Sequence, residues 1–168
     1  GCGSFSRGYI KKNKKIITLT DHDPRNIKDL KRKFNAHRNV KVTSQDLKKI
    51  RKKYDTIIYF NVLEHIKEDD KEIKLALSKL NKGGFLIILV PAHQKLYGNL
   101  DKAVGHYRRY NIRYFRKKFP KSEKVMIKYL DVMGYFLYYL NKVFFKKEVY
   151  PTSLKIFIWD LFDLNCHT

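Results

Sequence analysis

Cysteine is scarce in this 168-residue sequence, and long uncharged stretches are absent. The two cysteines, Cys2 and Cys166, lie near opposite ends, which excludes a disulfide framework and a zinc-knuckle spacing and fits a reducing cytoplasm. The longest run without a charge, residues 83–94, is well short of the ~20 residues that a membrane helix needs. The chain shows no secretory signal and does not begin with Met, and we expect a fragment that lacks its first strand and its C-terminal end.

Acidic residues are also few. Sixteen Asp and Glu stand against 37 Lys and Arg, which gives a formal net charge of +21. A polyanionic partner is one interpretation: nucleic acid, an acidic membrane surface or a phosphorylated substrate. The favoured interpretation is a solvated surface, because the lysines are scattered over the polar faces of the expected helices. With 43% hydrophobic residues, the chain is long enough for one globular domain.

Residues 54–65 are the stretch around which the chain is organised. The apolar run at residues 57–60 is typical of a buried parallel strand. Asn61 ends it, and Glu64 and His65 follow within one helical turn. Ligands of open α/β sheets lie just beyond the carboxyl ends of the strands. We therefore expect chemistry at Asn61, Glu64 and His65.

Three further segments are predicted strands, at residues 15–20, 39–43 and 85–90, and each ends in polar residues. Helices are predicted at 24–34, with Asp23 as cap and Pro24 at the first position, and from Asp69 or Asp70 to Lys82-Gly83-Gly84. Alternating strands and helices predict an α/β fold: a doubly wound, mostly parallel sheet.

Asp21 stands at the end of the strand at residues 15–20. An acid about 20 residues after a Gly-rich turn is the arrangement that binds ribose hydroxyls. The alternative is that Asp21 only supports the start of the following helix. The ribose interpretation is favoured because Gly1 and Gly3 precede it, although two glycines at this spacing are weak evidence alone.

Taken together, these motifs resemble the class I S-adenosylmethionine-dependent methyltransferases, with a Rossmann-like sheet. The resemblance covers about residues 1–120, and implies a cofactor-binding half (1–93) and a substrate half (94–168) within one domain. It implies S-adenosylmethionine as cofactor and S-adenosylhomocysteine as product. The residues expected to bind the cofactor are Gly1, Gly3, Asp21, His22, Asp46, Leu47, Asn61 and Val62.

The segment from Leu96 to Tyr110 resembles the lid or substrate wall that such proteins carry after strand five. His106 can exchange a proton, and Arg108 and Arg109 can bind a carboxylate or phosphate. The equal alternative is that these side chains pin the loop to the domain. His65 and His106 are the candidate catalytic bases. The residues expected to bind the acceptor are Glu64, Tyr97, Tyr107, Arg108 and Arg109.

We expect no metal. Similar ubiquinone-pathway enzymes bind a divalent ion with an acid at the position of Asn61 plus the Glu-His pair, and Glu64 with His65 alone makes a poor Mg²⁺ site.

The expected acceptor is a small molecule or is glycan- or lipid-linked. The alternatives are a nucleic-acid methyltransferase, which lacks its usual motif here, and a non-catalytic binding module. An NAD-type oxidoreductase is disfavoured by the motif after residue 60. No obligate protein partner is evident.

Beyond residue 110, Asn111 is predicted to cap a helix over residues 112–119, and residues 124–129 alternate like a strand. Aromatic residues between 135 and 145, edged by lysines, suit a membrane interface or the wall of an apolar pocket. Packing on the sheet is the favoured alternative. Residues 153–164 are a further helix candidate. The expected location is the cytoplasm, with peripheral membrane contact left open.

Overall fold

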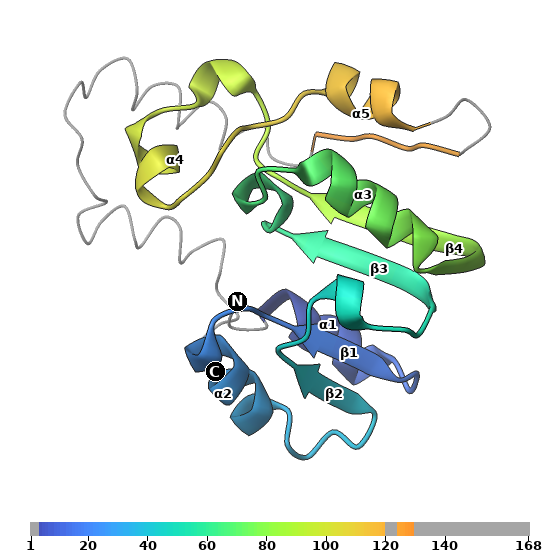
Figure 1. Cartoon of the computed structure of the whole chain (residues 1–168). Helices are drawn as coiled ribbons and strands as arrows, with labels where there is room; N and C mark the ends of the chain where they lie inside the picture. Colours follow the sequence, from blue (N-terminus) through green and yellow to red (C-terminus); the bar gives the residue numbers. More distant parts are fainter. Residues whose placement is uncertain (1–3, 120–123, 130–168) are drawn as a thin grey trace. The chain divides into compact units, whose positions relative to one another are not determined.

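The structure is a computed structural model of the chain, and it describes residues 4–119 and 124–129 (Figure 1). These residues form two compact units, which divide between Lys53 and Tyr54. Each unit has its own parallel pair of strands and its own core. The predicted α/β class with parallel strands is confirmed. The prediction of a single domain whose halves divide at residue 93 stays a prediction.

The first unit is a β–α–β crossover preceded by a helix. Strands β1 and β2 pair in parallel, with Ile17 opposite Val40 and Thr20 opposite Thr43. A parallel pair requires a crossover, and α2 supplies it. The elements are α1 (Ser4–Lys12), β1 (Ile17–Thr20), α2 (Pro24–Lys33), β2 (Val40–Thr43) and the 3₁₀ helix η1 (Leu47–Lys49).

Helix α2 begins where the sequence predicts. The Asp23 side chain accepts a hydrogen bond from the backbone N–H of Arg25 at 2.8 Å, and Pro24 takes the first helical position. Leu30 and Phe34 are buried with Ile10 and pack against β1 and β2. Each such side chain contributes about 1.5–3 kcal/mol when fully buried, so this apolar face is the main anchor of the helix.

Helix α1 was not predicted from the sequence. Ser and Gly are weak helix formers, so local propensity gives little sign of it. Ile10, buried at 3% exposure, ties α1 to the core of the first unit. Tertiary packing therefore specifies this helix.

The second unit is a second β–α–β crossover that continues into short helices. Strands β3 and β4 pair in parallel, with Ile57 opposite Leu86 and Phe60 opposite Leu89. Its elements are β3 (Tyr54–Phe60), η2 (Leu63–His65), α3 (Asp69–Ser78), β4 (Leu80–Leu89), η3 (Gln94–Leu96), α4 (Asn99–Ala103) and α5 (Ile112–Lys118).

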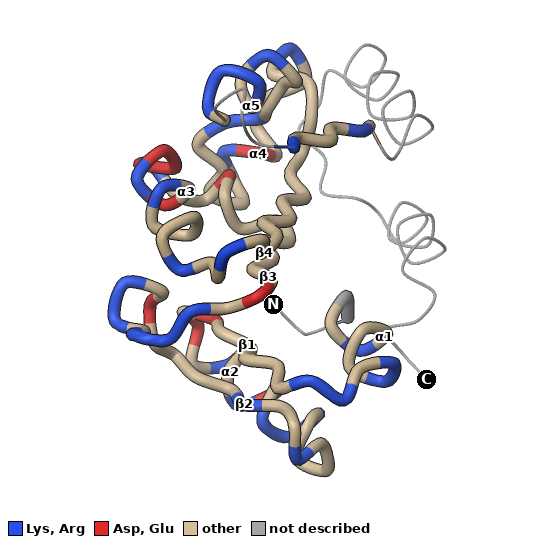
Figure 2. The backbone as a smooth tube through the Cα atoms, turned by 90° about the vertical axis from the view of Figure 1, so that its right-hand side faces the viewer, with Lys and Arg blue, Asp and Glu red and all other residues tan. Residues whose placement is uncertain are grey.

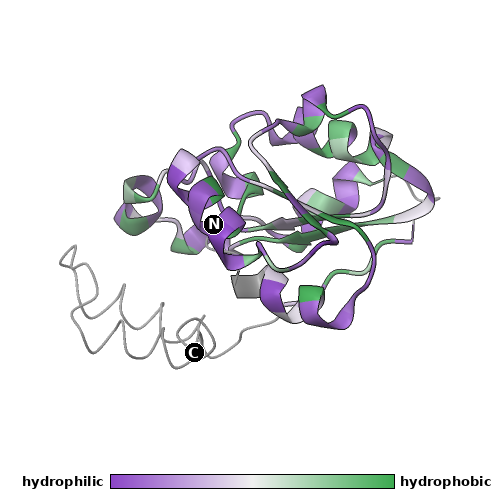
Figure 3. Cartoon of the chain, turned by 90° about the horizontal axis from the view of Figure 1, so that it is seen from below, coloured by the Kyte–Doolittle hydropathy of each residue, from purple (hydrophilic) through white to green (hydrophobic). Residues whose placement is uncertain are grey.

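The core of the second unit lies between η2, α3 and the segment after α4. Leu63, Ile73 and Tyr110 are buried together, with Leu86 and Ile88 packed against them. Hydrophobic residues run along the strands, and hydrophilic residues are frequent on the helices and loops (Figure 3). Lys and Arg occur on helices and loops of both units (Figure 2). Within the described residues, no helix is long and apolar enough to span a bilayer.

The predicted end of the second helix is wrong. Helix α3 ends at Ser78, and Gly83 and Gly84 lie inside β4. The register shifts there, because Tyr54 pairs with Leu80 whereas Thr56 pairs with Phe85. Gly83 has φ +76, and a Cβ on Gly84 would lie 2.9 Å from a backbone oxygen of the facing strand. The glycines therefore build a bulge.

Other boundaries also differ. Neither Asp69 nor Asp70 caps α3, because both lie in its first turn after Glu68. Residues 124–129 have no regular secondary structure, so the predicted strand there is wrong. Helix α5 is confirmed, with Asn111 accepting a hydrogen bond from the backbone N–H of Tyr114 at 2.8 Å. Gly1, Gly3 and the segments predicted at 135–145 and 153–164 lie outside the described residues.

Candidate functional site

In the first unit, the predicted cofactor residues follow the carboxyl ends of the paired strands β1 and β2. His22 Nδ1 lies 3.2 Å from Asp46 Oδ1, so the structure brings these two side chains together. Asp21 Oδ1 accepts hydrogen bonds from the backbone N–H of Asp23 at 2.9 Å and from Asn26 Nδ2 at 3.2 Å. Asp21 thus supports the start of α2, and its role toward ribose stays a prediction. Leu47 begins η1.

In the second unit, two strained residues stand beyond the paired strands β3 and β4. Asn61 has φ +48 and His93 has φ +62, both in the left-handed region that non-glycine residues seldom adopt. The Asn61 N–H donates to the carbonyl of Leu89 at 3.0 Å, which fixes the turn at the end of β3. Such strain is concentrated at functional sites. His93 was not singled out from the sequence.

The turn at Asn61 leads into η2, which buries Glu64 completely and leaves His65 exposed. His106 returns to this point from the segment after α4. Its Nε2 lies 3.9 Å from Glu64 Oε1, and its ring meets that of His65 edge to face with centroids 4.6 Å apart. The structure therefore gathers Glu64, His65 and His106 into one group, here called the β3-end cluster.

Asp101 orients the His106 ring through Nδ1, the nitrogen that does not face Glu64. Its Oδ1 lies 3.0 Å from His106 Nδ1 and accepts a hydrogen bond from Arg109 Nε at 2.8 Å, and its Oδ2 accepts from the Gly98 N–H at 3.0 Å. Burial would raise the pKa of Asp101, but the hydrogen bonds from Arg109 and His106 outweigh it and hold that pKa below its usual value. Asp101 is therefore an anion at neutral pH.

Glu64 and His65, the two cluster members besides His106, both have pKa values shifted in the direction that favours the neutral form. Burial raises the pKa of Glu64, and the charges of His106 and Asp101 act on it to a smaller extent. Burial, followed by the neighbouring His106 ring, lowers the pKa of His65. A neutral imidazole with a nitrogen lone pair is the form that accepts a proton or binds a cation.

Both arginines of the predicted lid make internal contacts. Arg109 is bound to Asp101, as described above. Arg108 Nη1 lies 2.6 Å from Asp69 Oδ1, and its Nη2 donates to the carbonyl of Lys67 at 2.7 Å. These contacts agree with the alternative that the arginines pin the loop. Their binding of an acceptor stays a prediction.

The predicted acceptor residues Tyr97 and Tyr107 lie beside the cluster. The Tyr97 hydroxyl donates to the carbonyl of His106 at 2.7 Å. The Tyr107 N–H donates to the carbonyl of Glu64 at 2.8 Å, and 52% of Tyr107 is exposed. The segment from Leu96 to Tyr110 is thereby held against η2, with the Tyr107 side chain accessible to solvent.

Sequence reasoning missed Asp101 and the partnership of Asp69 with Arg108 and Tyr110. Asp101 and Asp69 are 1% and 3% exposed. The signal for Asp101 was an acid five residues before His106, among cations. Nothing local pairs Asp69 with residues about 40 positions away.

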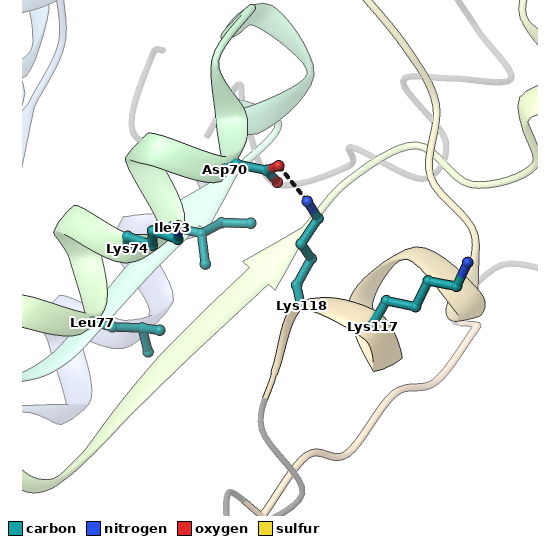
Figure 4. Close-up of a pocket in the computed structure, with 6 residues that line it drawn as sticks. All are labelled: Asp70, Ile73, Lys74, Leu77, Lys117 and Lys118. Carbon is teal, nitrogen blue, oxygen red and sulfur yellow. Dashed lines mark hydrogen bonds and ion pairs between the residues drawn. The ribbon is translucent and has the colours of Figure 1, made fainter.

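The described residues also line a pocket of about 250 Å³ between α3 and α5 (Figure 4). Ile73 and Leu77 form an apolar wall on α3. Lys117 and Lys118 of α5 line the other side, and Lys118 reaches across to pair with Asp70. The pocket contains none of the predicted site residues, so we assign it no part in the chemistry.

In the part of the chain that the structure describes, one group of side chains has the spacing to hold a metal ion. It is the β3-end cluster, whose ligand atoms lie within 4.8 Å of one another. The prediction of no metal, made from the sequence, considered Glu64 and His65 but not His106. The geometry of the three side chains does not by itself test that prediction.

Comparison with solved structures finds a similar fold in the N-methyltransferase NodS from Bradyrhizobium japonicum WM9, in complex with S-adenosyl-L-homocysteine. The TM-score is 0.52 at 19% identity, and the match covers 64% of this chain and 54% of the NodS chain. The chain thus spans about half the length of NodS, and the match confirms the predicted Rossmann-like class. No curated protein matches the sequence. A methyltransferase-domain family model matches residues 1–122, and the chain belongs to that family.

Proposed function

We propose that this protein transfers a methyl group from S-adenosylmethionine to a small-molecule, glycan- or lipid-linked acceptor and releases S-adenosylhomocysteine. The observation that carries the proposal is the β3-end cluster. A chain of the methyltransferase-domain family places a buried acid and two histidines just beyond a parallel strand, where ligands of such sheets bind.

The proposed cofactor site follows the order of the strands. The ribose is bound by Asp21 after β1, with His22 beside it. The adenine lies against Asp46 and Leu47 after β2. The methionine end lies at Asn61 and Val62 after β3. Gly1 and Gly3 complete the proposed set. Support comes from the family membership, and within each unit the described residues of the set follow the end of a strand.

Methyl transfer requires little from the protein beyond alignment of the acceptor atom with the methyl group. The acceptor atom attacks the methyl carbon of the sulfonium, the carbon–sulfur bond breaks, and the electron pair stays on sulfur as the neutral thioether. Alignment of the acceptor behind the methyl group supplies most of the acceleration. An acceptor O–H or N–H must also lose its proton, and we propose that His65 and His106 are the bases that accept this proton. Tyr97, Tyr107, Arg108, Arg109 and Glu64 form the proposed acceptor wall.

Two observations define the rival functions. The net charge of +21 favours a nucleic-acid acceptor. The internal pairing of Arg108 and Arg109 favours a methyltransferase-like module without catalysis, because these cations are already engaged.

Transfer of a radioactive methyl group from labelled S-adenosylmethionine separates these functions. The protein is incubated with small-molecule, lipid, glycan and RNA fractions of the host, and each fraction is counted. Label in a small-molecule, lipid or glycan fraction that is lost with His106→Ala supports the proposal. Label confined to RNA would establish the nucleic-acid alternative. Cofactor binding with no labelled fraction would favour the non-catalytic module.

A further inference from the structure

The carboxyl group of Glu64 has an unusual environment. Both of its oxygens are fully buried, and neither has a hydrogen-bond partner among the described residues. Glu64 as a whole is 0% exposed. A buried polar group without a partner costs about 1–3 kcal/mol, and more when it is charged. Such a group in a folded protein needs a physical explanation, and a bound ion is one of the common ones.

The surroundings of Glu64 supply cation ligands. His106 Nε2 lies 3.9 Å from Glu64 Oε1, and His65 completes a set whose ligand atoms lie within 4.8 Å of one another. Zn²⁺ binds such atoms at about 2.0–2.2 Å, which holds them roughly 3–3.5 Å apart. The three side chains therefore need to approach by about 1 Å, which small side-chain rotations can supply.

Each imidazole also has a neighbour on its Nδ1 side. Asp101 Oδ1 occupies the Nδ1 side of His106 at 3.0 Å, which leaves Nε2 facing Glu64. The backbone of Gly105 lies beside the His65 ring, close enough that a Cβ there would be 3.8 Å from His65 Nδ1. Metal-binding histidines commonly donate their second ring N–H to a carboxylate or a backbone carbonyl. His106 thus has the outer carboxylate partner that is common in metal sites, and His65 has a backbone neighbour on its Nδ1 side.

We propose that Glu64, His65 and His106 bind one divalent transition-metal ion, with Zn²⁺ as the first candidate. Two imidazoles and one carboxylate suit Zn²⁺ or Fe²⁺, whereas Mg²⁺ prefers oxygen ligands. An ion can enter from the side of His65, which is exposed, and of His106, which retains 16% side-chain exposure. The open coordination positions would face that side.

This proposal replaces the expectation of no metal, which rested on Asn61 standing where relatives have an acid. The third ligand comes from residue 106 instead, 41 positions beyond His65. Imidazoles that bind an ion do not accept a proton, so with the ion bound the two histidines would hold it, and the ion would supply the polarisation of an acceptor O–H or N–H. Metal binding does not depend on methyl transfer, and its test uses no acceptor.

The test is a titration of the chelator-treated protein with Zn²⁺, followed by calorimetry, and with Co²⁺, followed by visible absorption. The wild-type chain is compared with a Cys2→Ser/Cys166→Ser variant, so that thiols do not contribute. We expect one ion per chain in both. Glu64→Gln and His106→Ala should each weaken Zn²⁺ binding at least about 10-fold, and Asp101→Asn about 10–100-fold.

Two histidines of the described residues serve as matched controls. His22→Ala and His93→Ala should bind Zn²⁺ as the wild type does, because neither side chain belongs to the cluster. If Glu64→Gln does not fold, as judged by circular dichroism, His65→Ala carries the same test, because His65 is exposed. No stoichiometric binding, or equal binding by the cluster variants and the wild type, would overturn the proposal. Loss of binding in His22→Ala would do so as well.

Discussion

Tyr110 is the residue whose removal should most clearly loosen the segment that carries His106. Its side chain is 3% exposed, and its hydroxyl lies 2.9 Å from Asp69 Oδ2 and 3.0 Å from the carbonyl oxygen of Leu63. Its backbone N–H donates to the carbonyl of Pro91 at 2.9 Å. Tyr110 therefore joins the start of α3 and η2 through its side chain, and the segment after β4 through its backbone.

The change Tyr110→Phe keeps the ring, including its stacking on Phe115 at 5.3 Å, and removes only the hydroxyl. A hydrogen bond to a charged group contributes about 1.5–3 kcal/mol, and Asp69 is buried at 3% exposure. Asp69 keeps Arg108 as its partner at 2.6 Å, which limits the damage. We therefore expect Tyr110→Phe to lower the free energy of unfolding by about 2 kcal/mol.

Urea unfolding followed by circular dichroism measures this loss, with the slope m expected to stay unchanged. Tyr114→Phe is the matched control, because its hydroxyl donates to Asp70 at 2.9 Å and Asp70 is half-exposed. There we expect a loss of only about 0.5 kcal/mol, since exposed interactions with a charge are worth little. If Tyr110→Phe cost no more than Tyr114→Phe, the argument from burial would be refuted.

Three further predictions concern other parts of the chain. His106→Ala should lower turnover at least about 100-fold while S-adenosylhomocysteine affinity stays unchanged; equal turnover would make His106 structural. Asp23→Ala should cost about 1 kcal/mol in urea unfolding, whereas Asp23→Ser should retain most of the stability. Lys118, followed by Tyr114, holds the pKa of Asp70 below its unfolded value, so its stabilisation is present above about pH 4 and is lost as the pH falls. The stability difference between wild type and Asp70→Asn should therefore shrink toward pH 2; a constant difference would contradict this.

Elements defined by local signals could be predicted from the sequence. The apolar run of β3 and the Asp23-Pro24 start of α2 each carry their own evidence within a few residues. The end of α3 could not be predicted, because Gly83 and Gly84 look like a helix stop. Their role depends on how closely β4 approaches β3, which is a tertiary property.

The site could be predicted only in part, for the same reason. Glu64 and His65 were found because they follow a strand end. His106 was found as a candidate, but its position beside Glu64 requires the fold. Asp101 was missed because its importance lies in being buried beneath Arg109 and His106. Pairings over such distances in sequence leave no periodic signal.

Calorimetric titration of S-adenosylhomocysteine into the protein tests whether the chain has the proposed cofactor site. We expect one binding site per chain, and Asp21→Ala should abolish binding. Asn26→Ala is the matched control, because it removes a hydrogen bond to Asp21 near the start of α2 and keeps the carboxylate. It should bind as the wild type does. A folded protein that binds no S-adenosylhomocysteine, or that binds it equally well as Asp21→Ala, would contradict the proposed cofactor site.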